Sequence, residues 1–209
     1  MPDLPSHTTP RLILGSTSRY RRELLERLKL PFDVASPHVD EAPLPGETPA
    51  ALAQRLALAK ARAVAASRHG EDAIVIGSDQ VADVDGEPIG KPGTHERAVA
   101  QLRRMSQRSI VFQTAVAVVR ARTGFEAVRL APVRVQFRDL SDAEIERYLR
   151  LEQPYDCAGS AKSETLGIAL LSAIESDDPT ALVGLPLIRT CELLRAAGLD
   201  PIAMAGLAP

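Results

Sequence analysis

The chain has 209 residues, which is enough for one large domain or two small lobes. Hydrophobic residues make up 45% and charged residues 25%, as in ordinary soluble globular proteins, whereas aromatic residues make up only 3%, so the core must be aliphatic. The formal net charge of −2 argues against a general nucleic-acid-binding protein, although it leaves room for a local basic pocket that binds a small anion.

The ends of the chain and its cysteines suggest a cytoplasmic protein. Residues 1–10 lack the basic start and apolar middle of a signal peptide, so we expect a flexible leader, then one domain over 11–205 and a tail over 206–209. No apolar stretch approaches the length of about 18 residues that a membrane span needs. Cys157 and Cys191 lie far apart and fit no metal or redox spacing, which predicts free buried thiols in a reducing cytosol.

The first segment has the pattern of a strand, a loop of small residues and a helix. Residues 11–14 are apolar, Gly15 to Ser18 follow, and leucines at helical spacing predict a helix over 19–28 with Ser18 as its N-cap. Free N–H groups at such a helix start can bind an anion, and Arg21 would add charge. The alternative is a capped surface helix with solvated arginines. The Walker phosphate-binding pattern is absent.

A second strand and a long helix come next. Residues 32–36 predict a strand, and an extended segment then ends on the acids Asp40 and Glu41. Thr48 and Pro49 predict the start of a helix that runs to about residue 68. Lys60 lies beside the apolar face of this helix, where it could reach a pocket or extend to water, and the sequence favours water.

The stretch over residues 73–92 carries the most informative polar residue. An apolar run at 73–76 predicts a buried strand, which is interrupted at 77–80 and resumes at 81–84 before a hairpin turn at Asp85 and Gly86. A carboxylate directly after a buried strand is costly unless it is exposed in a cleft, paired or bound to metal. Asp79 therefore either caps a turn or faces a ligand, and the hairpin could bring Lys91 near it.

The rest of the chain alternates strands and helices, which predicts an α/β protein with one antiparallel region. A loop of small residues over 153–164 is long enough to be functional. Two adjacent acids before Pro179 predict a turn in preference to a metal site. The remaining elements are predicted as helices at 94–105, 141–151 and 186–197 and strands at 109–120, 133–137 and 167–174.

Several separated stretches together resemble the Maf family of nucleoside triphosphate pyrophosphatases, the septum formation inhibitor-like proteins. The resemblance covers Arg11 to Ile202 and is specific because the stretches occur in one order. They are LILGSTSRYRRELL (12–25), Val39-Asp40-Glu41, LALAKA (56–61), IGSDQV (76–81), GKP (90–92), CAGSAKSE (157–164) and LVGLPLI (182–188). The family implies an α/β fold with a central, mixed, twisted sheet flanked by helices, and two lobes with an active-site cleft between them.

The same motifs are similar to the branch of the family that hydrolyses 7-methyl-GTP, and not to the branch for dTTP and UTP. The resemblance implies that Asp79 is the proton acceptor and that Tyr20, Gln80 and Glu164 select the base. The chain departs from that branch in having Arg19-Tyr20 for Pro-Trp, Gly15 for Ala and Thr165 for Gly. We also expect a divalent cation, Mg²⁺ or Mn²⁺, on Glu41 and Asp79. The candidate phosphate ligands are Ser16, Ser18, Arg21, Lys60, Lys91 and Lys162.

The implied activity is a cytoplasmic house-cleaning hydrolysis that keeps a modified nucleotide out of nucleic acid. The expected partner is a small nucleotide; no nucleic acid or membrane partner is expected, and the family allows a homodimer. Two alternatives stay open at this point. One is a pyrophosphatase for other nucleotides, such as dTTP, UTP or noncanonical purines. The other is a non-catalytic nucleotide-binding regulator of septation, and the family's link to septation also allows the enzyme itself a role in cell division arrest.

Overall fold

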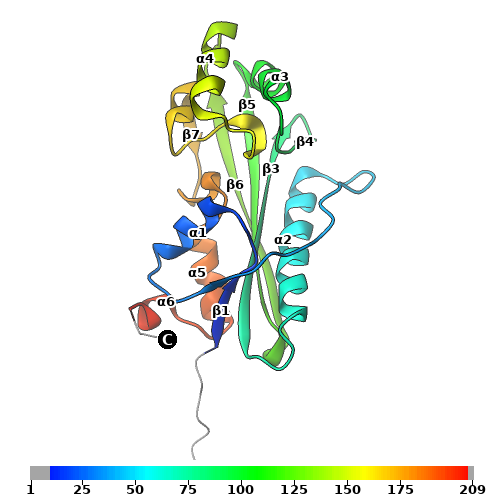
Figure 1. Ribbon diagram of the computed structural model, residues 1–209, viewed down its shortest axis with the longest axis vertical. Helices are drawn as coiled ribbons and strands as arrows, with labels where there is room; N and C mark the ends of the chain where they lie inside the picture. Colours follow the sequence, from blue (N-terminus) through cyan, green and yellow to red (C-terminus); the bar gives the residue numbers. More distant parts are fainter. Residues whose placement is uncertain (1–9, 207–209) are drawn as a thin grey trace, which may run out of the picture.

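One mixed β-sheet of seven strands organises the computed structural model, which describes residues 10–206 (Figure 1). The strand order is β2-β1-β3-β5-β6-β7, with β4 paired to β3 beside this path. The strands are β1 (Arg11–Leu14), β2 (Asp33–Val34), β3 (Ala73–Val84), β4 (Glu87–Ile89), β5 (Ser109–Arg120), β6 (Phe125–Phe137) and β7 (Leu171–Glu175). The helices are α1 (Arg19–Glu26), α2 (Pro49–Ala66), α3 (His95–Met105), α4 (Asp142–Glu152), α5 (Leu187–Ala196) and α6 (Pro201–Met204).

The pairing confirms the predicted α/β class with a mixed sheet. Strand β1 runs parallel to β2 and β3, whereas β3, β5, β6 and β7 pair antiparallel in succession. The long strands β3, β5 and β6 extend through most of the molecule (Figure 1). The predicted division into two lobes stays a prediction, because the strands form one sheet and their pairing marks no boundary between lobes.

Side-chain alternation on β3 decides which helices cover which face of the sheet. Ile74 and Ile76 pack in a cluster with leucines of α1 and α5, whereas Val75 packs in a cluster with α2. Helix α2 therefore covers one face and α1 and α5 cover the other, as Figure 1 shows. A third cluster joins α3 and α4 to the far ends of the long strands.

Gly77 lets α2 lie directly on β3. A Cβ atom at this position would lie 2.2 Å from the Ala57 carbonyl oxygen and 2.6 Å from the Ala61 backbone nitrogen. No side chain fits between the two elements here, so the helix backbone contacts the strand. This contact holds Lys60, one residue before Ala61, above the middle of β3.

The middle of β3 has one open edge. Strand β1 pairs only with residues 73–76 and β4 only with residues 82–84, so residues 77–81 pair only with β5. Strand β1 ends at this gap and the chain turns into α1. Ligands of open α/β sheets commonly bind at the carboxyl ends of strands where the connections part, which makes this gap the expected site.

Several predicted elements need correction. The predicted interruption at 77–80 is wrong, because β5 pairs with β3 without a break through this segment. The strand expected at 32–36 shrinks to β2. The first half of the strand expected at 167–174 is instead a 3-10 turn, since Gly167 packs against the Lys162 backbone, where a Cβ would lie 2.4 Å from its carbonyl oxygen. Helix α6 was not predicted, although Asp200 and Pro201 provide its cap and first residue.

The predicted helix starts at Thr48, Thr94 and Ser141 are confirmed, each with a side-chain cap, and Ser141 forms the full capping box with Glu144. Both cysteines are free, as predicted, but each is only partly buried. Within residues 10–206 no helix is both long and apolar enough to cross a bilayer. The predicted leader lies outside the described residues except for Pro10, and the predicted tail except for Gly206.

Candidate functional site

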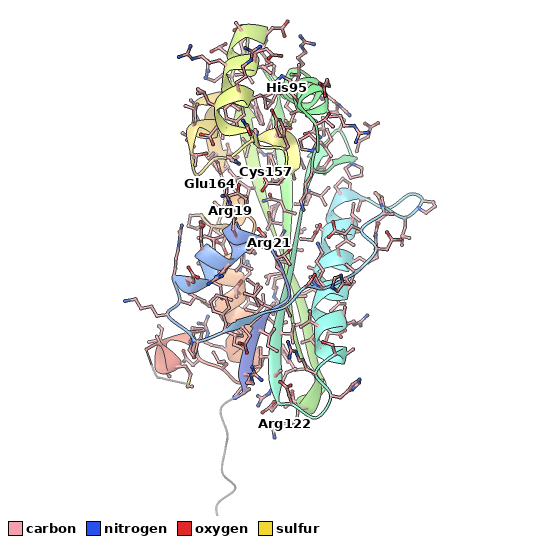
Figure 2. All side chains as sticks on the ribbon, viewed as in Figure 1. Arg19, Arg21, His95, Arg122, Cys157 and Glu164 are labelled. Carbon is pink, nitrogen blue, oxygen red and sulfur yellow. The ribbon has the colours of Figure 1, made fainter. Side chains whose placement is uncertain are left out.

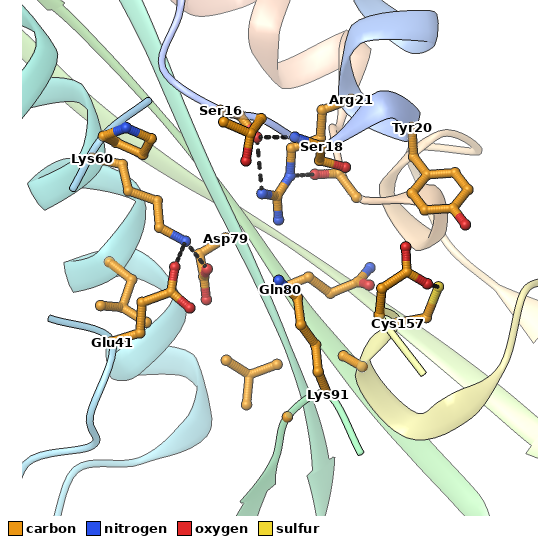
Figure 3. A pocket seen from close by; sticks show the side chains of 18 of the residues that line it. Ser16, Ser18, Tyr20, Arg21, Glu41, Lys60, Asp79, Gln80, Lys91 and Cys157 are labelled. Atoms are coloured by element: carbon orange, nitrogen blue, oxygen red, sulfur yellow. Dashed lines mark hydrogen bonds and ion pairs between the residues drawn. The ribbon is translucent and has the colours of Figure 1, made fainter. Parts of the chain in front are cut away.

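A cavity of about 820 Å³ opens at the gap in the edge of β3 (Figure 3). Its walls come from the β1–α1 loop, the segment after β2, α2, β3, and loops near residues 90, 157 and 183. All of the predicted site residues except Lys162 line it. These residues are Ser16, Ser18, Tyr20, Arg21, Glu41, Lys60, Asp79, Gln80, Lys91 and Glu164.

Lys60 joins the two predicted metal ligands at the floor of the cavity. Its Nζ lies 2.6 Å from an oxygen of Glu41 and 2.6 Å from Oδ1 of Asp79 (Figure 3). The side chains of Lys60 and Asp79 are only 6% and 10% exposed, whereas that of Glu41 is 55% exposed. The expectation that Lys60 extends to water is wrong, because two carboxylates compensate its burial.

The charges around Glu41 keep it ionised. Partial burial raises its pKa, but the hydrogen bond and charge of Lys60, with the charges of Lys91 and Arg21, more than offset burial, so the net pKa is below the ordinary value. On the other side, burial lowers the pKa of Arg21, and the charges of Asp79 and Glu41 oppose that shift. The site therefore combines an ionised Glu41 with several cations.

Asp79 and Gln80 point to opposite faces of β3, because successive side chains of a strand alternate. Asp79 faces α2, and Gln80 faces the loop before α5. The Gln80 amide nitrogen donates to Thr114 Oγ1 at 2.9 Å, Ala181 O at 3.0 Å and Leu182 O at 2.9 Å. These three acceptors engage both of its N–H groups, so the side chain can offer a ligand only its carbonyl oxygen.

The start of α1 forms another wall. Ser16 Oγ accepts from the Ser18 backbone N–H at 3.2 Å and from Arg21 Nη1 at 3.4 Å. Ser18 is the N-cap residue of α1, as predicted, but its side chain makes no capping hydrogen bond. Its hydroxyl is left available to a ligand.

Arg21 is held by the loop before α5. Its Nε donates to the Gly184 carbonyl at 2.9 Å, and the buried Ser78 hydroxyl donates to the same oxygen at 2.9 Å. Gly184 has a φ of +116°, a conformation that favours glycine. This loop therefore fixes the direction of the guanidinium toward the cavity.

Tyr20 carries a cation on its ring. The guanidinium carbon of Arg19 lies 4.7 Å from the ring centroid, and Arg19 Nη2 donates to the Tyr20 hydroxyl at 2.8 Å. Partial burial raises the pKa of Tyr20, and the bond from Arg19 opposes the rise. In Figure 2 Arg19, Arg21, Cys157 and Glu164 are labelled close together midway along the molecule.

Glu164 and Lys162 take different positions. Glu164 lies on the cavity wall, where partial burial raises its pKa although Lys162 nearby opposes this shift. The Lys162 ammonium donates to the Glu152 carbonyl at 2.9 Å at the end of α4, and its backbone N–H donates to the Tyr148 hydroxyl at 3.0 Å. In this arrangement Lys162 supports the loop and does not line the cavity.

Sequence reasoning missed several lining residues. Arg19, Asp156, Cys157 and Gly184 all contribute to the walls. Burial, followed by the charge of Asp156, raises the pKa of the Cys157 thiol to about 12, so this cysteine stays protonated. Cys157 and Gly184 lie inside stretches that carry the family resemblance, but their residue types gave no hint of a role.

The predicted metal ligands fit a cation that the substrate helps to hold. No group of three or more His, Cys, Asp or Glu side chains within residues 10–206 is arranged to bind a metal ion on its own. Mg²⁺ is commonly bound by one or two carboxylates together with substrate phosphates and water. Glu41 and Asp79, which contact the same ammonium, supply such a pair.

Comparisons with known proteins found one family model and several similar chains that match most of this sequence. A family model described as Maf-like protein matches residues 11–197. A protein from Polaromonas sp. named 7-methyl-GTP pyrophosphatase is 70% identical over 199 residues, which cover 95% of this chain and 90% of that protein. Proteins with the same name from Albidiferax ferrireducens and Thiobacillus denitrificans are 66% and 57% identical, over 90% and 93% of this chain and 94% and 96% of their own.

Proposed function

This chain belongs to the family of Maf-like proteins, and on that premise we propose that it hydrolyses 7-methyl-GTP to 7-methyl-GMP and pyrophosphate. The observation that carries the proposal is the pair of carboxylates, Glu41 and Asp79, beside a cluster of cations in one cavity. A protein that only bound a nucleotide would have no need of Asp79 as a base placed beside a metal.

The cations of the cavity suit a triphosphate, which carries roughly four negative charges. Arg21, Lys60 and Lys91 would bind the phosphate oxygens, and Ser16 and Ser18 would donate from the start of α1. Phosphoryl transfer needs little covalent chemistry from the protein, so holding the chain of phosphates in line supplies much of the catalysis. Lys162 does not line the cavity, so it would reach a phosphate only if its ammonium left the Glu152 carbonyl.

Glu41 and Asp79 would hold a divalent cation, which supplies charge stabilisation at the phosphate oxygens when bound. Asp79 would also accept the proton of the attacking water. Within the described part of the chain, only its Oδ1 has a hydrogen-bond partner, the Lys60 ammonium, which leaves Oδ2 to orient a water in the cavity.

Base choice would rest on three side chains. The Glu164 carboxylate can accept from the N1–H and N2–H₂ edge of guanine, and the free carbonyl oxygen of Gln80 can accept beside it. Methylation at N7 gives guanine a positive charge, which favours stacking on the face of Tyr20. Uracil and thymine would present an oxygen acceptor to Glu164, an unfavourable pairing.

The direct test is to incubate the pure protein with Mg²⁺ or Mn²⁺ and a panel of triphosphates and to identify the products. We expect 7-methyl-GMP and pyrophosphate. Orthophosphate with a diphosphate would contradict the proposed bond cleavage. Faster turnover of UTP, dTTP or another purine would favour the wider pyrophosphatase, and no turnover of any nucleotide would favour the septation regulator.

A substitution of Glu164 tests base choice separately. Glu164→Gln replaces one acceptor oxygen by a donor, so we expect the preference for 7-methyl-GTP over UTP to fall by roughly tenfold to a hundredfold. Steady-state kcat/KM for both substrates measures it, with Glu175→Gln, an exposed glutamate outside the cavity, as the matched control. Undiminished preference in the Glu164→Gln variant would refute this account of base choice.

The same proposal includes a cytoplasmic location, a single domain over residues 11–205 and a homodimer as the state to test. Size-exclusion chromatography with light scattering measures the oligomeric state of the full chain. The roles proposed for Asp79, Glu41 and Glu164 do not depend on its outcome.

A further inference from the structure

The two carboxylates that would bind the metal already share a cation. Lys60 Nζ lies 2.6 Å from both Glu41 and Asp79, so the ammonium lies between the oxygens that a divalent ion would contact (Figure 3). Lys60 comes from α2, whose backbone rests on Gly77 of β3, and it is almost fully buried. The backbone that carries Lys60 is therefore held in place near the two carboxylates.

Other cations add to this compensation. The charge of Arg21 acts on both Asp79 and Glu41, and that of Lys91 acts on Glu41. Among these five side chains, three positive charges thus stand against two negative charges before any ligand arrives. A divalent cation entering alone would have to displace Lys60 from the two carboxylates.

A triphosphate reverses the balance. Its roughly four negative charges exceed the local excess and offer Lys60 new oxygens, so the ammonium can turn from the carboxylates to the phosphates. Glu41 is the partner best able to adjust, because its side chain is 55% exposed and that of Asp79 only 10%.

We infer that Lys60 takes the place of the divalent cation in the nucleotide-free protein, so that metal binds tightly only together with a triphosphate. Lys60 is then a positioning residue that keeps the two carboxylates close and blocks metal binding in the empty cavity. The inference rests on the proposed function for the identity of the metal ligands, but its test needs no turnover.

The test measures Mn²⁺ binding to the full chain without nucleotide. Binding is monitored as the loss of the electron paramagnetic resonance signal of free Mn²⁺. We expect weak binding by the unaltered protein and a dissociation constant lower by roughly tenfold or more in Lys60→Met, which removes one charge next to both ligands. Lys91→Met is the matched control, because Lys91 lines the same cavity and forms no ion pair with either carboxylate among the described residues. Its dissociation constant should change by less than about threefold.

The second part of the test repeats the Mn²⁺ titration with inorganic tripolyphosphate present. The result is corrected for the Mn²⁺ that tripolyphosphate binds by itself. Tripolyphosphate should tighten Mn²⁺ binding to the unaltered protein and much less to Lys60→Met. Thermal unfolding checks that the variant folds, and Lys60→Gln, which keeps a donor for the carboxylates, replaces it if it does not.

Equal Mn²⁺ affinity in the unaltered protein and both Lys60 variants would overturn the inference. An equal gain in Mn²⁺ affinity in Lys91→Met would also overturn it, because the gain would then be a general effect of removing a positive charge. If the Lys60 effect appears but no triphosphate is hydrolysed, the proposed function fails and the metal inference stands. If 7-methyl-GTP is hydrolysed without the Lys60 effect, the metal inference fails and the proposed function stands.

Discussion

Two clusters of three charged side chains lie at β3 and just before its start, and their arrangements of charge are opposite. At the cavity, one cation, Lys60, lies between two carboxylates. Just before β3 begins, one carboxylate, Asp72, lies between two cations, Arg120 and Arg122, at 2.8 Å and 2.7 Å. Figure 2 shows Arg122 at one end of the molecule, away from Arg21 and Glu164, which lie midway along it.

In the Asp72 cluster, hydrogen bonds from arginine occupy both carboxylate oxygens. Arg120 binds both oxygens of Asp72 with Nε and Nη2, and its Nη1 donates to the Ala197 carbonyl at 2.7 Å. This planar fork joins the start of β3, the end of β5 and the end of α5. The Lys60 cluster uses a single flexible ammonium and leaves carboxylate oxygens facing a cavity. One arrangement fastens the fold, and the other leaves positions for ligands.

The largest expected effect separates these two roles. Asp79→Asn removes the proposed proton acceptor and a charge on the metal, so we expect turnover of 7-methyl-GTP to fall by roughly 10²- to 10⁴-fold. Folding should persist, since the amide oxygen can still accept from Lys60. The measurements are kcat and the midpoint of thermal unfolding. A near-normal kcat in the Asp79→Asn variant would remove Asp79 from the mechanism.

Asp72→Asn should show the reverse pattern and serves as the control for Asp79→Asn. Its side chain is 13% exposed, and the hydrogen bonds of Arg120, opposed by burial and helped by Arg122, lower the pKa of Asp72 from 3.8 to about 2. We expect a loss of about 1–2 kcal/mol in the free energy of unfolding at neutral pH, after allowing for solvent screening. Chemical denaturation measures this loss, and kcat should stay unchanged.

The pH dependence of this loss follows from the direction of the pKa shift. Because the folded-state pKa of Asp72 is lowered, its stabilisation is complete above the unfolded value near 3.8 and disappears as the pH falls toward about 2. The difference in unfolding free energy between the unaltered protein and Asp72→Asn should therefore shrink between about pH 4 and pH 2. A constant difference across that range would assign the loss to packing.

Local features of the fold could be predicted from the sequence because neighbouring residues determine them. The caps at Thr48, Thr94 and Ser141 and the turn at Asp85 and Gly86 depend on residues a few positions apart. Features that depend on distant contacts could not. The continuity of β3 past Gly77 depends on β5, which lies more than thirty residues further along the chain.

The candidate site shows the same division. Asp79 stood out because a carboxylate in an apolar strand needs a partner, but nothing local indicated that Lys60 is that partner, and helical spacing favoured the solvent instead. The position of Lys162 behind the wall depends on its contact with the end of α4. The family resemblance supplied the set of residues, and the structure supplied their pairing.

The smallest expected effect concerns a third cation, Arg19, which competes for a ligand position as Lys60 does but at the exposed rim. Arg19 lies over the Tyr20 ring, where a positively charged 7-methylguanine would stack, and two cations cannot share that face. Arg19→Ala should free the face and lower KM for 7-methyl-GTP by about two- to fivefold, with kcat unchanged and a smaller change for unmethylated GTP. Arg22→Ala is the control, because Arg22 pairs with Glu26 outside the cavity. A higher KM for 7-methyl-GTP in Arg19→Ala would mean instead that Arg19 binds the substrate directly, and the Lys60 cluster alone would then hold a cation in a ligand's place.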